Sequence, residues 1–386
     1  MKISEQFIYN IYMNIVGYVK KFGNKSFKEL PFNDVDALIF SEISYMNIDR
    51  LFTGHRFSKL KDLVIEDKHE FYYSSVDSFN NRRLFESMMK SKRYGNVKIG
   101  YARGNVNLKT NEQFYALTII MPDKTRFISF RGTDVTISGW KEDLLIAFKE
   151  GIPSQKSALK YVKDVLKKFD TNFYLGGHSK GGNLAIYSAL HMGKRYEKRL
   201  IKAYSFDGPG FRSNIYKLDS YKRISDRFEK YLTTHDMIGV IYNKNPNPKI
   251  VYSDGILLGG HDLFAWNIKR NEPTFVYAKE RSTFSKESEV ALMNWLYSED
   301  DESKEIAVQM VFDILGDSKT VFDLLLNAGR LITNGKKSYD KYPPEQKEKV
   351  KEIFKQLGKY YLSAYSPKKF LLQKFKLKKS EDNDDQ

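Results

Sequence analysis

A serine flanked by glycines carries the strongest chemical signal in the chain. Ser179 lies in the string Gly177-His178-Ser179-Lys180-Gly181, after an apolar segment typical of a strand and before one typical of a helix. This is the setting that a G-x-S-x-G nucleophile turn requires. Glycines let strand and helix approach closely, and the helix start directs its amides toward charge developing beside the hydroxyl. We therefore predict that Ser179 is a nucleophile.

A serine hydroxyl needs an imidazole to take its proton, and in folds with this turn the chain order is nucleophile, acid, histidine. Four histidines precede the turn or lie within it or its helix and are excluded by that order: His55, His69, His178 and His191. His235 adjoins Asp236, and neighbours on an extended segment point to opposite sides. His261, in a glycine-rich loop late in the core, is the predicted base.

Two carboxylates are candidates for the acid that orients the imidazole. Asp236 ends the strand-like segment 227–236, which is the placement expected for this acid. Asp207 ends an earlier strand-like segment, in the F-D-G-P-G string at 206–210, and capping of a helix would explain it structurally. We predict Asp236 as the acid and keep Asp207 as the alternative.

The segments around these residues alternate between strand and helix from about residue 112. Apolar runs at 114–120 and 126–130, joined by a Pro-Asp turn, predict a hairpin. Helical and strand-like patterns then follow in turn, at about 154–169, 173–175, 183–191 and 203–206. The alternation predicts an α/β fold in which helices flank a mostly parallel central sheet. Ligands of such sheets bind at the carboxyl ends of the strands, where the turn with Ser179 falls.

Three units are predicted along the chain. Residues 1–30 begin with apolar side chains four apart, which predicts an amphipathic helix and not a signal peptide. Residues 31–297 form the predicted main domain, and an acidic break opens a helical extension over 298–386. Its end interleaves lysines with apolar residues between 368 and 379, before an acidic tail.

Composition limits the chemistry and the partners. The chain has 386 residues, 41% of them hydrophobic, and no cysteine, which excludes a thiolate nucleophile, a disulfide and a thiolate metal site. No phosphate-loop string is present, and we predict no cofactor and no metal. The net charge of +16 is spread among 48 acidic residues, so we expect no nucleic-acid partner.

The expected location also follows from these patterns. No segment approaches the roughly 18 apolar residues of a membrane span. Without cysteines or an export signal, we expect a cytoplasmic protein. The basic amphipathic end predicts peripheral contact with an anionic membrane.

Two further strings resemble the class 3 lipases. F-R-G-T at 130–133 and W-K-E-D-L at 140–144 look like the F-R-G-[ST] and W-x-x-D-L signature of that family. The resemblance covers about 112–266 and implies an α/β-hydrolase fold. It also implies that Thr133 contributes to an oxyanion hole and that Asp143 holds Thr133 in place.

The string G-H-S-K-G-G-N, with F-N-D-V-D-A at 32–37, is similar to a bacterial branch, the Mbeg-like hydrolases. This extends the likeness to about 32–297. Lys180 stands where the lipases commonly have an apolar residue, so the resemblance favours ester cleavage without pointing to triglycerides.

The predicted function is therefore that of a serine hydrolase (esterase or lipase-like) that cleaves carboxylic esters, of small molecules or of lipids, through an acyl-enzyme. The amides of Thr133 and Lys180 are expected to bind the oxyanion. The alternative is a non-catalytic lipid-binding or membrane-surface protein that retains the hydrolase fold.

Overall fold

The computed structural model describes most of the chain and almost all of its central part. The described residues are 11–51, 56–72, 77–107, 110, 112–133, 151–212, 215–245, 247–255, 257–298, 300–315, 337, 339–352 and 355.

A mixed β-sheet runs through the molecule, and its central strands are parallel. Within the described residues it has the strand order β11-β9-β8-β7-β6-β5-β4-β3-β2. Neighbours from β5 to β9 pair in parallel, and the remaining pairs at both edges are antiparallel. The strands are β2 (Phe57–Lys59), β3 (Lys98–Asn107), β4 (Glu112–Ile120), β5 (Arg126–Phe130), β6 (Phe173–His178), β7 (Leu200–Phe206), β8 (Phe228–Thr233), β9 (Lys249–Val251) and β11 (Tyr277–Ala278).

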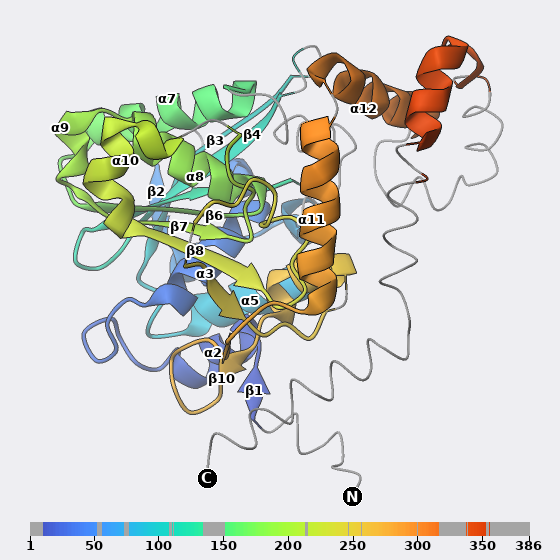
Figure 1. Ribbon diagram of the computed structural model, residues 1–386. Helices are drawn as coiled ribbons and strands as arrows, with labels where there is room; N and C mark the ends of the chain where they lie inside the picture. The colour runs from blue at the N-terminus through green and yellow to red at the C-terminus, as the bar shows by residue number, and fades with distance from the viewer. Residues whose placement is uncertain are drawn as a thin grey trace, which may run out of the picture.

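Helices cover both faces of this sheet (Figure 1). One face carries α7 (Pro153–Lys168), α8 (Lys180–His191), α9 (Lys194–Glu197) and α10 (Asp219–Ile224). The other carries α2 (Ile15–Phe22), α3 (Asp34–Glu42), α4 (Lys68–Tyr72) and α5 (Ser78–Lys90). Residues of β5 point to both faces of the sheet. Phe127 packs in the apolar cluster that contains α3, whereas Ile128 and Phe130 pack in the cluster that contains α8. The predicted α/β-hydrolase fold is confirmed.

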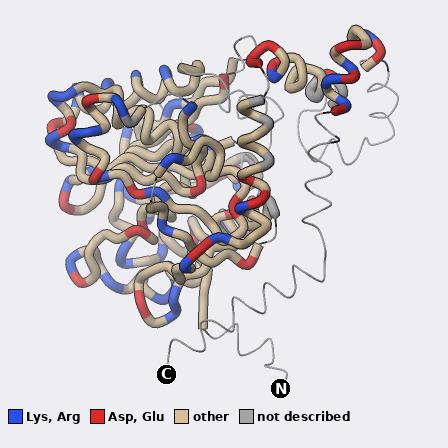
Figure 2. The backbone as a smooth tube through the Cα atoms, in the orientation of Figure 1, with Lys and Arg blue, Asp and Glu red and all other residues tan. Residues whose placement is uncertain are grey.

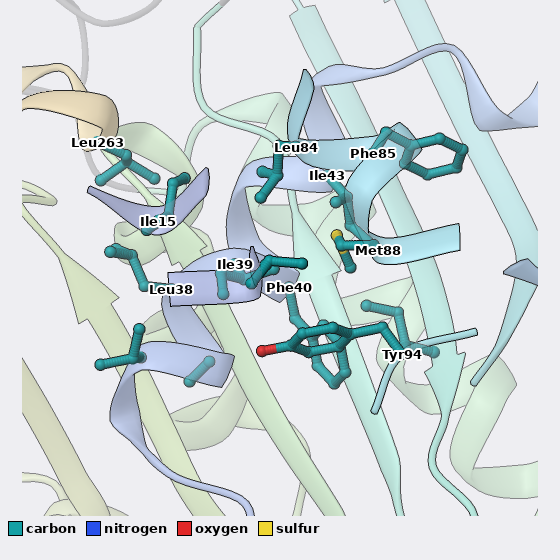
Figure 3. Close-up of a cluster of buried hydrophobic side chains, with 14 of the residues drawn as sticks. Ile15, Leu38, Ile39, Phe40, Ile43, Leu84, Phe85, Met88, Tyr94 and Leu263 are labelled. Carbon is teal, nitrogen blue, oxygen red and sulfur yellow. The ribbon is translucent and has the colours of Figure 1, made fainter. Parts of the chain in front are cut away.

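The layer that contains α3 is the larger apolar core. Figure 3 shows some of its side chains, among them Ile15 of α2, Leu38 of α3, Phe85 of α5 and Leu263, which follows His261. Leu263, two residues after His261, is 1% exposed in this cluster. Burial of Leu263 therefore fixes the loop that carries the histidine.

The start of α3 is held by polar contacts. The Asn33 side chain caps the helix by accepting hydrogen bonds from the amides of Val35 and Asp36. Asp36 is itself buried and accepts hydrogen bonds from the guanidinium of Arg93 and from the hydroxyl of Tyr94. Both charges are buried, and their pairing links the first turn of α3 to the segment that carries Arg93.

The hairpin and the alternating elements are where the sequence predicts them. β4 and β5 pair antiparallel with Ile120 opposite Arg126, and α7, β6, α8, β7 and β8 follow in the expected order. The N-terminal helix differs from the prediction. A two-residue strand, β1 (Tyr12–Met13), pairs with β10 (Ile268–Lys269), and α2 begins only after Asn14, whose side chain caps it by accepting from the amide of Gly17. Residues 1–10 lie outside the described residues.

The predicted acidic break separates two helices, α11 (Thr283–Ser298) and α12 (Asp301–Leu315). Arg212 pairs with Asp301, and Val308 packs with Tyr242 and Leu296, so α12 contacts the main domain. Much of the predicted helical extension, including the basic segment at 368–379, lies outside the described residues. None of the helices in the described part of the chain is long and apolar enough to cross a membrane.

Candidate active site

Ser179 is the single residue between strand β6 and helix α8. Its backbone has φ 56° and ψ −130°, a combination that costs free energy for any residue other than glycine. The amide of Ser179 donates to the carbonyl of Phe206 at 2.9 Å, which ties the turn to the end of β7. The strained turn thus holds the serine at the carboxyl ends of the parallel strands.

The two glycines of the motif make this turn sterically possible. A Cβ on Gly181 would lie 2.2 Å from the carbonyl oxygen of Phe130, and one on Gly177 would lie 2.4 Å from the carbonyl carbon of Gly181. Both distances are shorter than side chains tolerate. The start of α8 therefore touches the ends of β5 and β6 only because these positions lack side chains.

The F-R-G-T segment lies directly against the serine. A Cβ on Gly132 would come within 3.1 Å of Cβ of Ser179. Arg131 anchors the segment by donating from Nε to the carbonyl of Ser44 at 2.6 Å and from Nη2 to that of Met46 at 2.9 Å. The segment thus brings Thr133, which is half-buried, to the region beside the nucleophile turn.

Lys180 is the first residue of α8, and its side chain is buried, with Nζ donating to Oε1 of Gln113 at 3.3 Å. Its long side chain thus packs against β4, while its amide belongs to the helix start next to Ser179. Asp143, which the lipase resemblance assigns to the support of Thr133, lies outside the described residues.

His261 meets Asp207 and not Asp236. Nδ1 of His261 lies 2.7 Å from Oδ2 of Asp207. Asp207 directly follows β7, has no exposed surface and has a positive φ of 52°. The prediction that Asp236 contacts the imidazole is therefore wrong, and the alternative carboxylate occupies that place. The physical reason is strand order. Asp207 follows β7, the direct neighbour of the strand β6 that leads to Ser179, whereas Asp236 follows β8, which is one strand further away.

Asp236 lies behind this pair, fully buried. Its Oδ1 accepts hydrogen bonds from the amides of Ile238 and Gly239, both at 2.8 Å. Burial raises the pKa of Asp236 well above its usual value, and the charge of Asp207 adds to the shift. Burial likewise raises the pKa of Asp207, to about 6.

Lys230, on β8, adds a buried positive charge beside the two carboxyl groups. Its Nζ donates to the carbonyl of Gly208. Burial lowers the pKa of Lys230 to about 8, although Asp236 and Asp207 both act to raise it. Nothing in the sequence motifs marks this residue.

His178 packs against the predicted base. The ring centroids of His178 and His261 are 4.3 Å apart, and Nδ1 of His178 is 2.8 Å from the hydroxyl of Tyr45. Burial lowers the pKa of His178 well below its usual value, so its ring stays neutral. Tyr45 belongs to a short 3-10 helix after α3 and lies in no motif. His235 points elsewhere, with Nδ1 at 3.1 Å from Oγ of Ser282.

Family membership is shown by a match over much of the chain. The family model described as Mbeg1-like matches residues 88–313, a span that contains Gly132, Ser179, Asp207 and His261. The chain belongs to the Mbeg1-like family. The predicted resemblance to this branch is thereby confirmed. Most site residues of this Mbeg1-like protein lie within the matched span, and those around Tyr45 precede it.

Solved structures similar to this Mbeg1-like protein include two described as lipases. M37 lipase has 16% identity, covers 55% of this chain and 71% of its own, and has a TM-score of 0.38. A mutant form of MDLA from Penicillium cyclopium has 13% identity, coverages of 61% and 84%, and a TM-score of 0.36. A triacylglycerol lipase of Penicillium expansum has 14% identity, coverages of 47% and 82%, and a TM-score of 0.30. No curated protein matches the chain. Because the TM-scores are below 0.5, the fold assignment rests on the strand order and the serine turn.

A methyl group at Gly181 should damage both stability and reactivity. In Gly181→Ala the new Cβ would force α8 away from the carbonyl of Phe130, and overpacking of this kind costs about 1–3 kcal/mol of unfolding free energy. We expect a lower urea midpoint and slower labelling of Ser179 by a fluorophosphonate. Gly259→Ala is the matched control, because a Cβ there meets no atom within 4 Å and should leave the midpoint unchanged. Equal midpoints for the two variants would contradict the close approach of α8 and β5.

Proposed function

We propose that this Mbeg1-like protein is a serine hydrolase that cleaves carboxylic esters, with Ser179 as nucleophile, His261 as base and Asp207 as the acid that orients the base. The observation that carries the proposal is the 2.7 Å contact of His261 with the buried carboxylate of Asp207. This contact lies at the carboxyl ends of the central strands, where the strained serine turn also lies. The ring of His261 packs on His178, the residue immediately before Ser179.

The proposed reaction follows from these placements. With Nδ1 donating to Asp207, Nε2 of His261 is the basic nitrogen and accepts the proton as Oγ of Ser179 attacks the ester carbonyl. The carbonyl oxygen becomes negative, and the amides of Thr133 and Lys180 stabilise it. His261 then protonates the departing alcohol, which leaves an acyl group on Ser179. Water, activated by the same imidazole, releases the acid and restores the serine.

The position of α8 supports the oxyanion part of this proposal. Lys180 begins the helix, so its amide is one of those with no partner inside the helix and lies at the positive end of the helix dipole. Gly132 lies against Ser179, so the next residue, Thr133, is close to the same turn. We propose that Asp143 supports Thr133 from the segment outside the described residues.

The proposed substrate is a small-molecule or lipid ester. Figure 2 shows basic and acidic residues interspersed along the described part of the chain, so charge alone points to no polyanionic partner. The absence of a nucleic-acid partner, the cytoplasmic location and the membrane contact stay predictions, since the basic segment that motivates the last of these lies outside the described residues.

Labelling by a fluorophosphonate probe tests the proposed function. We expect the folded protein to react within minutes and the label to lie on the peptide that contains Ser179, as found by mass spectrometry. Denatured protein is the control, because an unactivated serine does not react. A series of p-nitrophenyl esters of increasing acyl length would then rank substrates. Folded protein that is unlabelled, or labelled on another serine, would exclude the proposal.

A further inference from the structure

The carboxyl groups of Asp207 and Asp236 face each other inside the protein. Oδ2 of Asp236 and Oδ1 of Asp207 lie 2.6 and 2.9 Å from the same point, the position that a Cβ on Gly239 would take. Each carboxyl group acts on the pKa of the other, as two groups in close approach do. Both facing oxygens are buried, and among the described residues no group donates a hydrogen bond to either of them. Gly239 leaves the space in which they meet.

The other two oxygens are already occupied. Oδ2 of Asp207 contacts Nδ1 of His261, and Oδ1 of Asp236 accepts from the amides of Ile238 and Gly239. Two carboxylates in buried contact cannot both be ionised, because their repulsion and desolvation are too costly. The facing oxygens are satisfied only if one proton lies between them.

The charged groups around the pair fit a single negative charge. Lys230, on β8, acts on both carboxyl groups, and His261 faces Asp207 from its loop. Arg281 also acts on Asp207, but its charge is already paired with Glu289. One negative charge shared by the carboxyl groups balances the buried ammonium of Lys230. Two negative charges or none would leave a buried charge without a counterpart.

We propose that Asp236 is a positioning residue that holds a proton and donates it in a hydrogen bond to Asp207, which thereby keeps its charge and its orientation toward His261. This inference rests on the proposed role of His261 as base. Asp236 acts through Asp207 and has no contact with the reacting atoms.

Two effects compete for the place of the proton. The amides of Ile238 and Gly239 favour a charged Asp236, but they bind Oδ1, which in the protonated acid is the carbonyl oxygen and still accepts both. Asp207 receives the N–H of His261, which requires a charged or carbonyl acceptor. Burial raises the pKa of both carboxyl groups, and the contact with His261 favours the charged form of Asp207, so the proton belongs to Asp236.

Conservative substitution separates a proton donor from a charged acid. Asp236→Leu removes the donor, and we expect kcat/KM for an activated ester to fall by about 10²-fold, as for other residues that orient a reacting group. Asp236→Asn keeps Oδ1 for the two amides and offers an N–H to Asp207, so it should recover most of that loss. Asp207→Asn should fall by about 10⁴-fold. If Asp236→Asn were as inactive as Asp207→Asn, Asp236 would carry the charge and the inference would be overturned.

Infrared spectroscopy detects whether a carboxyl group is protonated, and this measurement does not depend on turnover. The difference spectrum of wild type minus Asp236→Asn at neutral pH should contain the carbonyl band of a protonated carboxyl group, which shifts in D2O. An ordinary aspartate loses its proton near pH 4, so in wild type alone the band should persist far above that pH. Glu42 is also buried, and burial raises its pKa well above the usual value, so only the difference spectrum assigns the band to Asp236. Asp236→Leu replaces Asp236→Asn in that spectrum if the latter does not fold. Bands of ionised carboxylates alone would refute the shared proton, whereas absent fluorophosphonate labelling would refute the proposed function and leave this test standing.

Discussion

In the Ser179→Ala variant we expect turnover of an activated ester to fall by about 10⁶-fold. The reason is that no other hydroxyl can take the place of one held between β6 and α8 in a strained turn. Alanine tolerates this backbone as well as serine does, so the urea midpoint should stay within error of wild type. Initial rates and fluorophosphonate labelling measure the effect.

A second serine on the same helix provides the control. Ser188 is fully buried on α8 and takes no part in the site, so Ser188→Ala should keep wild-type labelling. A Ser179→Ala protein that is folded and still hydrolyses esters at more than a few per cent of the wild-type rate would exclude Ser179 as the nucleophile. Water attack assisted by His261 would then be the reaction to examine.

Loss of His261 should be equally severe. In His261→Ala the serine keeps its position but lacks an acceptor for its proton, and kcat should again fall by about 10⁶-fold. His178 cannot substitute although its ring lies 4.3 Å away, because Tyr45 contacts its Nδ1 and burial lowers its pKa far below the usual value. Rates at several pH values would show whether any imidazole still contributes.

The double variant Ser179→Ala/His261→Ala tests whether the two residues act as one unit. Residues that act together are not additive, so the double variant should be no slower than either single one. His191→Ala is the control, since His191 is exposed at the far end of α8, where its Nδ1 contacts the carbonyl of Tyr187. Additive losses would mean that His261 acts independently of the serine.

Local patterns in the sequence predict much of the central domain. Apolar runs, glycines and turn residues are sufficient for the hairpin, for α7, β6, α8 and β7, and for the turn with Ser179. Chain order also points to His261, whose Nδ1 meets a buried carboxylate in the structure. These features depend on residues close together in the sequence, so the sequence of this one protein is enough to predict them.

The contacts between distant segments are not visible in this way. Asp207 and Asp236 both follow strands, and only the order of strands in the sheet shows which one His261 meets. Tyr45 reaches His178 across more than a hundred residues, and Lys230 lies in no motif. At the N-terminus, apolar spacing predicts a continuous helix, but pairing of Tyr12 with Lys269 and the cap at Asn14 override it locally.

The positive φ of Ser179 also has an evolutionary consequence. A backbone in this conformation costs about 1–3 kcal/mol for a residue other than glycine, so serine at position 179 lowers the stability of the fold. Selection for a reactive hydroxyl would account for a serine at this position. In a descendant that had lost hydrolysis and served only as a scaffold, glycine would be the favoured replacement at position 179. A glycine at this position in a relative would therefore indicate loss of the activity.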